Sequence, residues 1–171
     1  MIAALMTFAR RFLVFQAFLL WQGGFVFYAG VVVPVGTEVL GDALRQGAVT
    51  QQVTNWLNLI GLIWHGLFAW DVFAGADPSR RRRRWRAGLW AVSLALLAGL
   101  AGLHPKLDAM FDGDTISRGD RATFYLWHET YLCLSTAHWV LGLANAGLTL
   151  AAWAASPRDS ATSVLGRSPA V

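Results

Sequence analysis

The chain has 171 residues, of which 56% are hydrophobic and only 14% are charged, and its formal net charge is +4. Soluble domains are about a quarter charged, so this composition excludes an ordinary soluble protein and predicts an integral membrane protein. Ten of the fourteen basic residues lie just outside apolar segments. We therefore interpret the positive charge as a determinant of membrane topology, and we expect no nucleic-acid partner.

Four apolar segments predict four membrane-spanning helices. A span needs roughly 20 apolar residues to cross a hydrocarbon core of about 30 Å, and lipid leaves backbone groups no partner outside a helix. The expected spans cover residues 12–34, 53–72, 87–104 and 124–154. The first is too long for the core of a cleaved signal peptide. We predict an all-α four-helix membrane bundle over residues 1–155 and a disordered cytoplasmic tail over residues 156–171.

The segments between the spans contain turn and capping residues. Residues 37–46 are predicted to form an interfacial helical turn, and a second short helix is expected to begin at Pro105. Ser117 and Asp120 resemble a capping box that opens the fourth helix. Four aspartates nearby favour a solvated loop over a calcium site, because they lack EF-hand spacing; they are Asp108, Asp112, Asp114 and Asp120.

Basic residues are distributed unevenly between the two sides of the membrane. If the spans cross the membrane alternately, ten basic residues lie on one side and four on the other. The four are Arg45, Lys106, Arg118 and Arg121. By the positive-inside rule the first side is cytoplasmic and holds both termini. It includes a dense arginine run in which each residue contributes about 1 kcal/mol near an anionic surface. We expect this run to bind anionic lipid headgroups through Arg80, Arg81, Arg82, Arg83, Arg84 and Arg86. The predicted location is a multi-pass membrane position, the inner membrane in a bacterium.

Two of the spans carry polar residues at helical spacing. Intervals of three and four place residues on one helix face. In the second span this face contains Gln51, Thr54, Asn58, Gly61 and His65. In the fourth it contains Tyr131, Ser135, His138, Gly142, Asn145 and Thr149. Each face includes one histidine, which in a membrane core is expected to point into the bundle.

The two histidines are predicted to lie at the same depth. His65 is twelve residues from Val53 and His138 is twelve residues from Leu126, which corresponds to about 18 Å at 1.5 Å per residue. Gln22 of the first span falls within one turn of the same level. These residues, with Asn58, Tyr131, Ser135 and Asn145, form the expected polar interior of the bundle.

Three interpretations of this interior remain open. The first is structural: the polar groups bond between helices, and Ala87, Ala91, Ala95 and Gly99 allow the third span to pack closely. The second is an electron carrier in which His65 and His138 ligate haem b or another metal. The third is a transporter or proton path lined by the polar residues, although no carboxylate lies at mid-membrane. No catalytic motif is present, so an enzyme is not expected.

Two segments resemble a known family. They are Phe18–Gly36, FLLWQGGFVFYAGVVVPVG, and Phe124–Asn145, FYLWHETYLCLSTAHWVLGLAN. The Trp and paired glycines before a proline, and the aromatic, histidine-containing opening of the fourth span, are similar to the DUF4149 / TMEM205-like four-span membrane proteins. The resemblance implies a small membrane bundle without an assigned reaction. From it and from composition we expect a scaffold, a partner subunit or homo-oligomer, or a small-solute permeation factor.

Overall fold

Every secondary-structure element of the described residues, 2–110 and 121–156 of the computed structural model, is helical. The elements are α1 (Ile2–Phe27), the π-helical turn η1 (Tyr28–Val32), α2 (Val33–Leu40), α3 (Ala43–Ala74), α4 (Arg80–Met110) and α5 (Arg121–Ala155). Asp112, Asp114, Ser117, Arg118, Asp120 and the tail from residue 157 lie outside the described residues, as do the capping box and most of the acidic loop predicted there.

Three helical stretches among the described residues are long and apolar enough to cross a membrane. They are the continuous stretch Ile2–Leu40, α3 and α4. Large apolar side chains such as Leu19, Leu62 and Val92 are about half exposed on their surfaces. Exposed apolar surface on this scale marks contact with a partner protein or with a membrane. On helices of this length and composition it fits contact with lipid. The sequence-based expectation of a membrane protein is therefore supported, while the role of α5 as a fourth span stays a prediction.

The first helix continues beyond Pro34, where the predicted span was expected to end. Proline lacks an amide hydrogen and its ring collides with the preceding turn. The wider π-helical turn precedes it, with the Val33 amide donating to the Tyr28 carbonyl. The helix ends at Gly41, whose φ is 64°, and the Asp42 side chain caps α3 by accepting from the Leu44 amide at 2.8 Å. The predicted single turn over residues 37–46 is therefore wrong, because a two-residue turn interrupts it.

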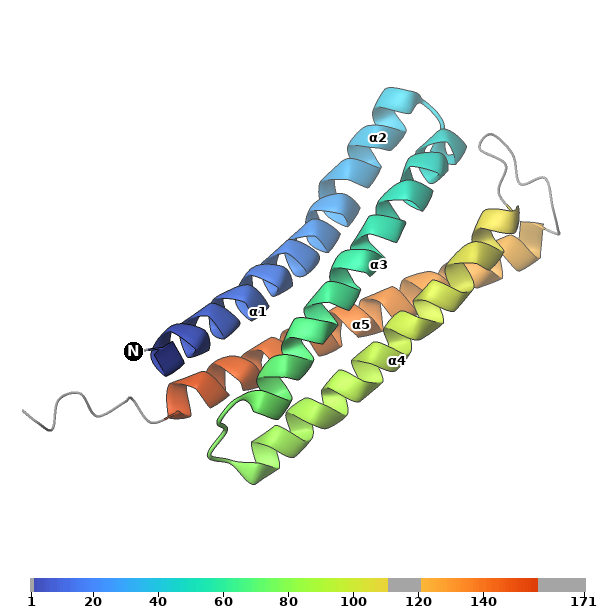
Figure 1. Cartoon of the computed structure of the whole chain (residues 1–171). Helices are drawn as coiled ribbons and strands as arrows, with labels where there is room; N and C mark the ends of the chain where they lie inside the picture. The colour runs from blue at the N-terminus through green and yellow to red at the C-terminus, as the bar shows by residue number, and fades with distance from the viewer. Residues whose placement is uncertain (1, 111–120, 157–171) are drawn as a thin grey trace, which may run out of the picture.

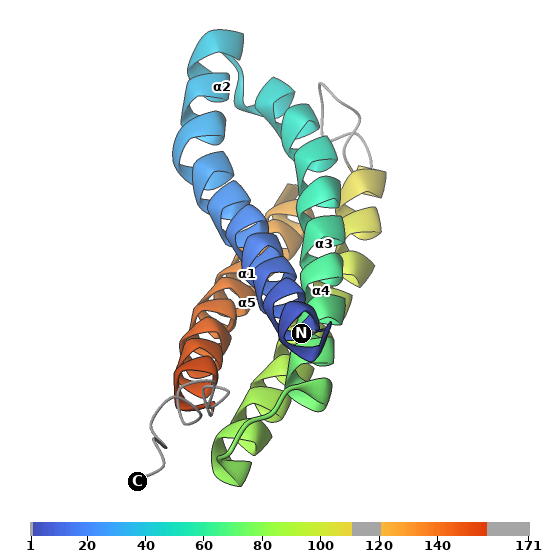
Figure 2. The same cartoon turned by 60° about the vertical axis from the view of Figure 1, so that its left-hand side comes forward.

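The helices run alternately up and down. Figure 1 shows α3 beside α1, α4 beside α3, and α5 behind them, and in Figure 2 α1 crosses α5. The start of α1, the α3–α4 connection and the end of α5 lie at one end of the assembly (Figure 1). We call this the basic end, because it holds Arg10, Arg11 and the arginine run. The other end holds the α2–α3 turn, Lys106 and Arg121.

Helix α4 corrects two expectations. It passes through Pro105 without a break and ends at Met110, so no separate helix begins at the proline. Of the four small residues expected to pack closely, Ala91 and Ala95 are exposed, whereas Ala87 packs against the α1–α3 core and a Cβ at Gly99 would lie 3.9 Å from Leu134 of α5. The buried face of α4 is offset from Ala91 and Ala95, because polar and larger groups make the contacts with α3 and α5. It consists of Arg86, Ser93, Leu97, Leu100, Leu103 and His104.

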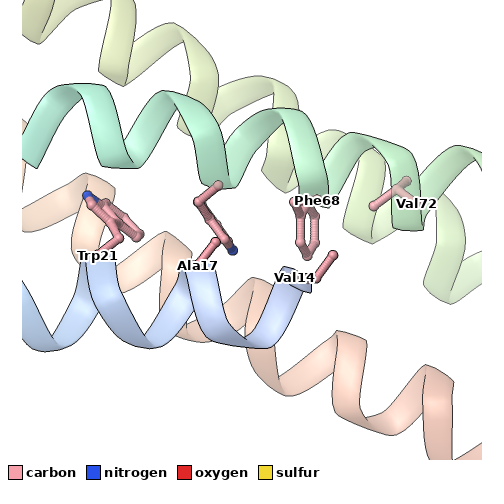
Figure 3. Packing of buried hydrophobic residues seen from close by; sticks show 6 residues of the cluster. Val14, Ala17, Trp21, Phe68 and Val72 are labelled. Atoms are coloured by element: carbon pink, nitrogen blue, oxygen red, sulfur yellow. The ribbon is translucent and has the colours of Figure 1, made fainter. Parts of the chain in front are cut away.

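Apolar packing is concentrated between α1 and α3 towards the basic end. Figure 3 shows Val14, Ala17 and Trp21 of α1 facing Phe68 and Val72 of α3. The rings of Trp21 and Trp64 stack with centroids 4.9 Å apart. A second apolar cluster joins α4 to α5 further from the basic end and consists of Leu100, Leu103 and Tyr131.

Candidate functional site

His65 of α3 and His138 of α5 meet in the interior. Their rings stack with centroids 5.2 Å apart and planes 27° apart, and the two residues are 1% and 2% exposed. The prediction that they share one level is confirmed. Gln22 joins this level from α1, because its Nε2 donates to the Trp139 carbonyl at 3.0 Å. We call these three residues the histidine layer.

Both ring nitrogens of His65 have partners. Nδ1 lies 2.7 Å from the Gly61 carbonyl and Nε2 lies 3.1 Å from Ser93 Oγ. A carbonyl only accepts, so Nδ1 carries the proton and Nε2 of the neutral ring accepts from the serine hydroxyl. His65 is therefore fixed as one tautomer by its own helix and by α4.

His138 is held differently, because its Nε2 is buried without a hydrogen-bond partner among the described residues. The residue borders a cavity of about 30 Å³, which is room for about two water molecules at roughly 10–15 Å³ each. The remaining wall combines polar residues of the two predicted faces with apolar ones, namely Thr54, Asn58, Tyr131 and Ser135 with Trp21, Phe25, Leu57 and Leu100. Asn58 Nδ2 donates to the Tyr131 hydroxyl at 3.1 Å. His138, with its unpaired ring nitrogen, therefore borders a small cavity with a partly polar wall.

Other polar atoms near the histidine layer are also buried without partners in the described part of the chain. They are Gln22 Oε1, Trp64 Nε1, Trp139 Nε1 and both side-chain polar atoms of Asn145, which is fully buried. A buried group left unsatisfied costs about 1–3 kcal/mol. Asn145 was predicted to be interior and is buried, about two turns nearer the basic end than His138, and its side chain has no hydrogen-bond partner among the described residues. The level around the histidines thus has unused hydrogen-bonding capacity.

A second polar cluster lies beyond the cavity, towards the end opposite the basic end. His104 Nε2 lies 2.8 Å from Thr54 Oγ1, and His104 Nδ1 lies 2.9 Å from Asp108 Oδ2. Sequence reasoning missed this cluster, because it started a new helix at Pro105. The available signal was the spacing of four between His104 and Asp108, which one continuous helix places on the same face.

The basic end is tied together by Asp71. Its carboxylate accepts from Arg10 Nε at 3.0 Å, from Arg86 Nη2 at 2.6 Å and from Trp153 Nε1 at 3.0 Å. These partners come from α1, α4 and α5, so one side chain of α3 contacts all the other long helices. We call this set the Asp71 cluster. The sequence analysis overlooked it, because Asp71 stands at the edge of a predicted span.

Asp77, in the α3–α4 connection, forms a second ionic contact at this end. Arg82 Nη2 and Nε donate to its two oxygens at 2.7 and 3.1 Å, and the Ser79 amide donates at 2.9 Å. The hydrogen bonds from Arg82 are the main reason that the pKa of Asp77 lies below its ordinary value. Arg86 Nη1 is 3.8 Å away and adds a weaker attraction.

The expected lipid-binding role of the arginine run is corrected for two members. Arg86 is 2% exposed and pairs with Asp71, while Arg82 is occupied by Asp77. Helix α4 turns these two residues towards the bundle, because they lie four apart on one face. The others remain exposed at the surface, namely Arg80, Arg81, Arg83 and Arg84.

The histidine pair does not fit a bis-histidine haem as it stands. Such an iron needs one ring nitrogen from each side at about 2 Å, with an open slot for the macrocycle between them. Here the rings pack directly on each other and both His65 nitrogens are bonded. Within the described ranges, no three His, Cys, Asp or Glu side chains gather as a metal site.

Comparisons of the chain with protein-family models, curated proteins and solved structures found no match. The resemblance to DUF4149 / TMEM205-like proteins therefore stays a prediction.

Proposed function

We propose that this is a four-span membrane protein with both termini in the cytoplasm, and that it acts as a small-solute permeation factor whose solute is the proton. The observation that carries the proposal is that His138, whose Nε2 is buried without a partner, borders a cavity whose wall includes hydroxyl and amide groups. An imidazole can bind and release a proton, and ionisable groups within membrane spans commonly mark ion or proton pathways.

The size and chemistry of the cavity favour the proton over larger solutes. Its volume of about 30 Å³ admits water and little else. Its polar lining consists of neutral hydrogen-bonding side chains, without a carboxylate to attract a metal cation. Water in the cavity can hand a proton to His138 Nε2, and the hydroxyls of Tyr131 and Ser135 can orient that water.

The interior on the side of the basic end is mainly apolar. Trp64 and Phe68 pack against α1 below the histidine layer and border a mostly apolar cavity of about 40 Å³, and the Asp71 cluster joins the helices at the basic end. We therefore propose that a proton reaches His138 from the outer side, and that its release inward requires the helices to separate at the Asp71 cluster. Such a change is a shift between two packed states.

Proton movement is tested with the full chain in sealed vesicles that enclose a pH-sensitive dye, with a potassium gradient and valinomycin to drive proton entry. The proposal predicts acidification faster than in protein-free vesicles. A rate equal to that of protein-free vesicles would contradict it and would favour the scaffold or partner-subunit interpretation.

The orientation has its own support and test. The basic residues gathered at one end fit a cytoplasmic position by the positive-inside rule. With Cys133 replaced by Ala, Ala43→Cys and Ala76→Cys each place one exposed thiol at opposite ends of α3. An impermeant maleimide added to intact cells should label Ala43→Cys alone. Labelling of Ala76→Cys alone would reverse the topology.

The exposed arginines of the run are proposed to bind anionic lipid headgroups. Each contributes about 1 kcal/mol near such a surface. Replacing Arg80, Arg81, Arg83 and Arg84 by Gln should remove the anionic lipids that copurify with the protein. Replacing Arg82 by Gln is the matched control, because Asp77 already occupies it. Unchanged lipid in the fourfold variant would contradict the proposal.

A further inference from the structure

The outer polar cluster contains a buried histidine that the histidine layer does not use. His104 is 7% exposed and bridges two groups, Asp108 on its own helix and Thr54 on α3. The Asp108 side chain is 32% exposed, so it has access to the outside. Thr54 borders the cavity that reaches His138. The cluster therefore connects the outer surface with the proposed proton chamber.

Hydrogen-bond chemistry assigns one proton of this cluster. Thr54 Oγ1 lies 2.8 Å from the Thr50 carbonyl and 3.1 Å from the Gln51 carbonyl of its own helix. With its single proton donated to either carbonyl, the hydroxyl oxygen accepts from His104, and His104 Nε2 then carries a hydrogen.

A second proton is shared at the other ring nitrogen. Nδ1 and Asp108 Oδ2 are 2.9 Å apart, a hydrogen-bonding distance that two bare acceptors would not keep. One proton therefore lies between them, as imidazolium with carboxylate or as neutral histidine with carboxylic acid. Both descriptions have the same net charge.

The surroundings of His104 suit a group that changes protons. Tyr131 of α5 meets the ring edge-on with centroids 6.1 Å apart, and Thr54 approaches from α3. Asp108 is the charged group in contact with it on α4. The neighbouring Lys106 turns its ammonium over the Trp127 ring, 5.1 Å from the centroid.

We propose that Asp108, His104 and Thr54 form the site at which protons enter from the outer aqueous phase, an inference that rests on the proposed proton movement. A proton binds the other oxygen of Asp108, Oδ1, and the proton shared with Oδ2 moves to Nδ1 while the Nε2 proton leaves for Thr54 Oγ1. The Thr54 hydroxyl rotates towards the cavity and gives its own proton to water there, which delivers one to His138 Nε2. One proton enters and one leaves, and no electrons move.

Vesicle flux measurements with paired variants test the entry site. Asp108→Asn and Thr54→Val should each slow proton uptake by about 100-fold, because a positioned proton-transfer group typically contributes 10²–10⁴ in rate. Glu129→Gln and Thr136→Val are matched controls, since both residues are outside the cluster and Thr136 bonds its own helix. The controls should conduct like the wild type. If wild type and both cluster variants conduct equally, the entry site is overturned while proton movement stands.

Nitrogen NMR of the full chain with ¹⁵N-labelled histidine adds a readout independent of flux. The His104 signals are assigned by their loss in His104→Gln. The inference predicts a proton on Nε2 in the wild type, and a changed Nδ1 signal in Asp108→Asn. A bare Nε2 would overturn it. A wild type that does not conduct would overturn the proposed function and the entry role together, whatever the NMR shows.

Discussion

Asp71 Oδ2 and Arg86 Nη2 lie 2.6 Å apart, and both side chains are 2% exposed. The pair joins α3 to α4 at the basic end, and Arg10 and Trp153 extend it to α1 and α5. A charge buried this deeply depends on its partner, because neither water nor lipid replaces the lost contact.

Replacing Asp71 by Asn should therefore destabilise the protein. Breaking a buried pair by removing one partner costs about 3–5 kcal/mol, and Asn leaves the Arg86 charge without its closest carboxylate. Unfolding in mixed micelles with increasing SDS measures the change. Glu38→Gln, an exposed acidic residue at the other end, is the control. An equal effect in both variants would refute the role of the cluster.

Opening of the Asp71 cluster should also change proton movement. If inward release requires separation of the helices there, a variant with a weakened cluster should conduct faster than the wild type in the vesicle assay. Arg10→Gln removes one partner at the less buried edge, where the side chain is 13% exposed. Slower conduction in Arg10→Gln, with unfolding behaviour unchanged, would argue against an inner gate.

The contribution of Asp77 to stability should depend on pH. Arg82 lowers the pKa of the folded-state carboxyl below the ordinary value, which is about 3.9 in unfolded chains. The ionised group therefore stabilises the fold above that value, and the contribution is lost as pH falls through the lower folded-state pKa. The difference in unfolding free energy between wild type and Asp77→Asn should be present at pH 7 and shrink below about pH 4. A difference that grows in acid would contradict this.

Gly142 should not tolerate a methyl group. A Cβ there would collide with Gln22 Nε2 and would lie 2.6 Å from Trp21 Cζ3, so Gly142→Ala should cost about 1–3 kcal/mol by overpacking. Gly147→Ala on the same helix is the matched control, since its Cβ would meet nothing within 4 Å. Unfolding titrations should separate the two variants. Equal stability would mean that α5 does not approach α1 this closely.

The sequence predicted that His65 and His138 lie at one level because the rise per residue of a helix is a local property. The number of residues from the end of each span therefore gives the distance along the helix. It did not predict the Asp71 cluster, since a carboxylate at the edge of a span looks like a boundary residue. Its partners, Arg10 and Trp153, are distant in the sequence. The outward position of Ala91 and Ala95 shows a similar limit: spacing identifies a face of α4, but packing decides which face is buried.

Proton flux in His138→Gln, compared with His128→Gln, tests the central claim most directly. Both variants replace a histidine of α5, but His128 is stacked on Phe124 near the outer end and does not border the cavity. We expect uptake to fall by about 100-fold in His138→Gln and to stay at the wild-type rate in His128→Gln, with matching unfolding curves for both. Wild-type conduction in a folded His138→Gln variant would contradict the account.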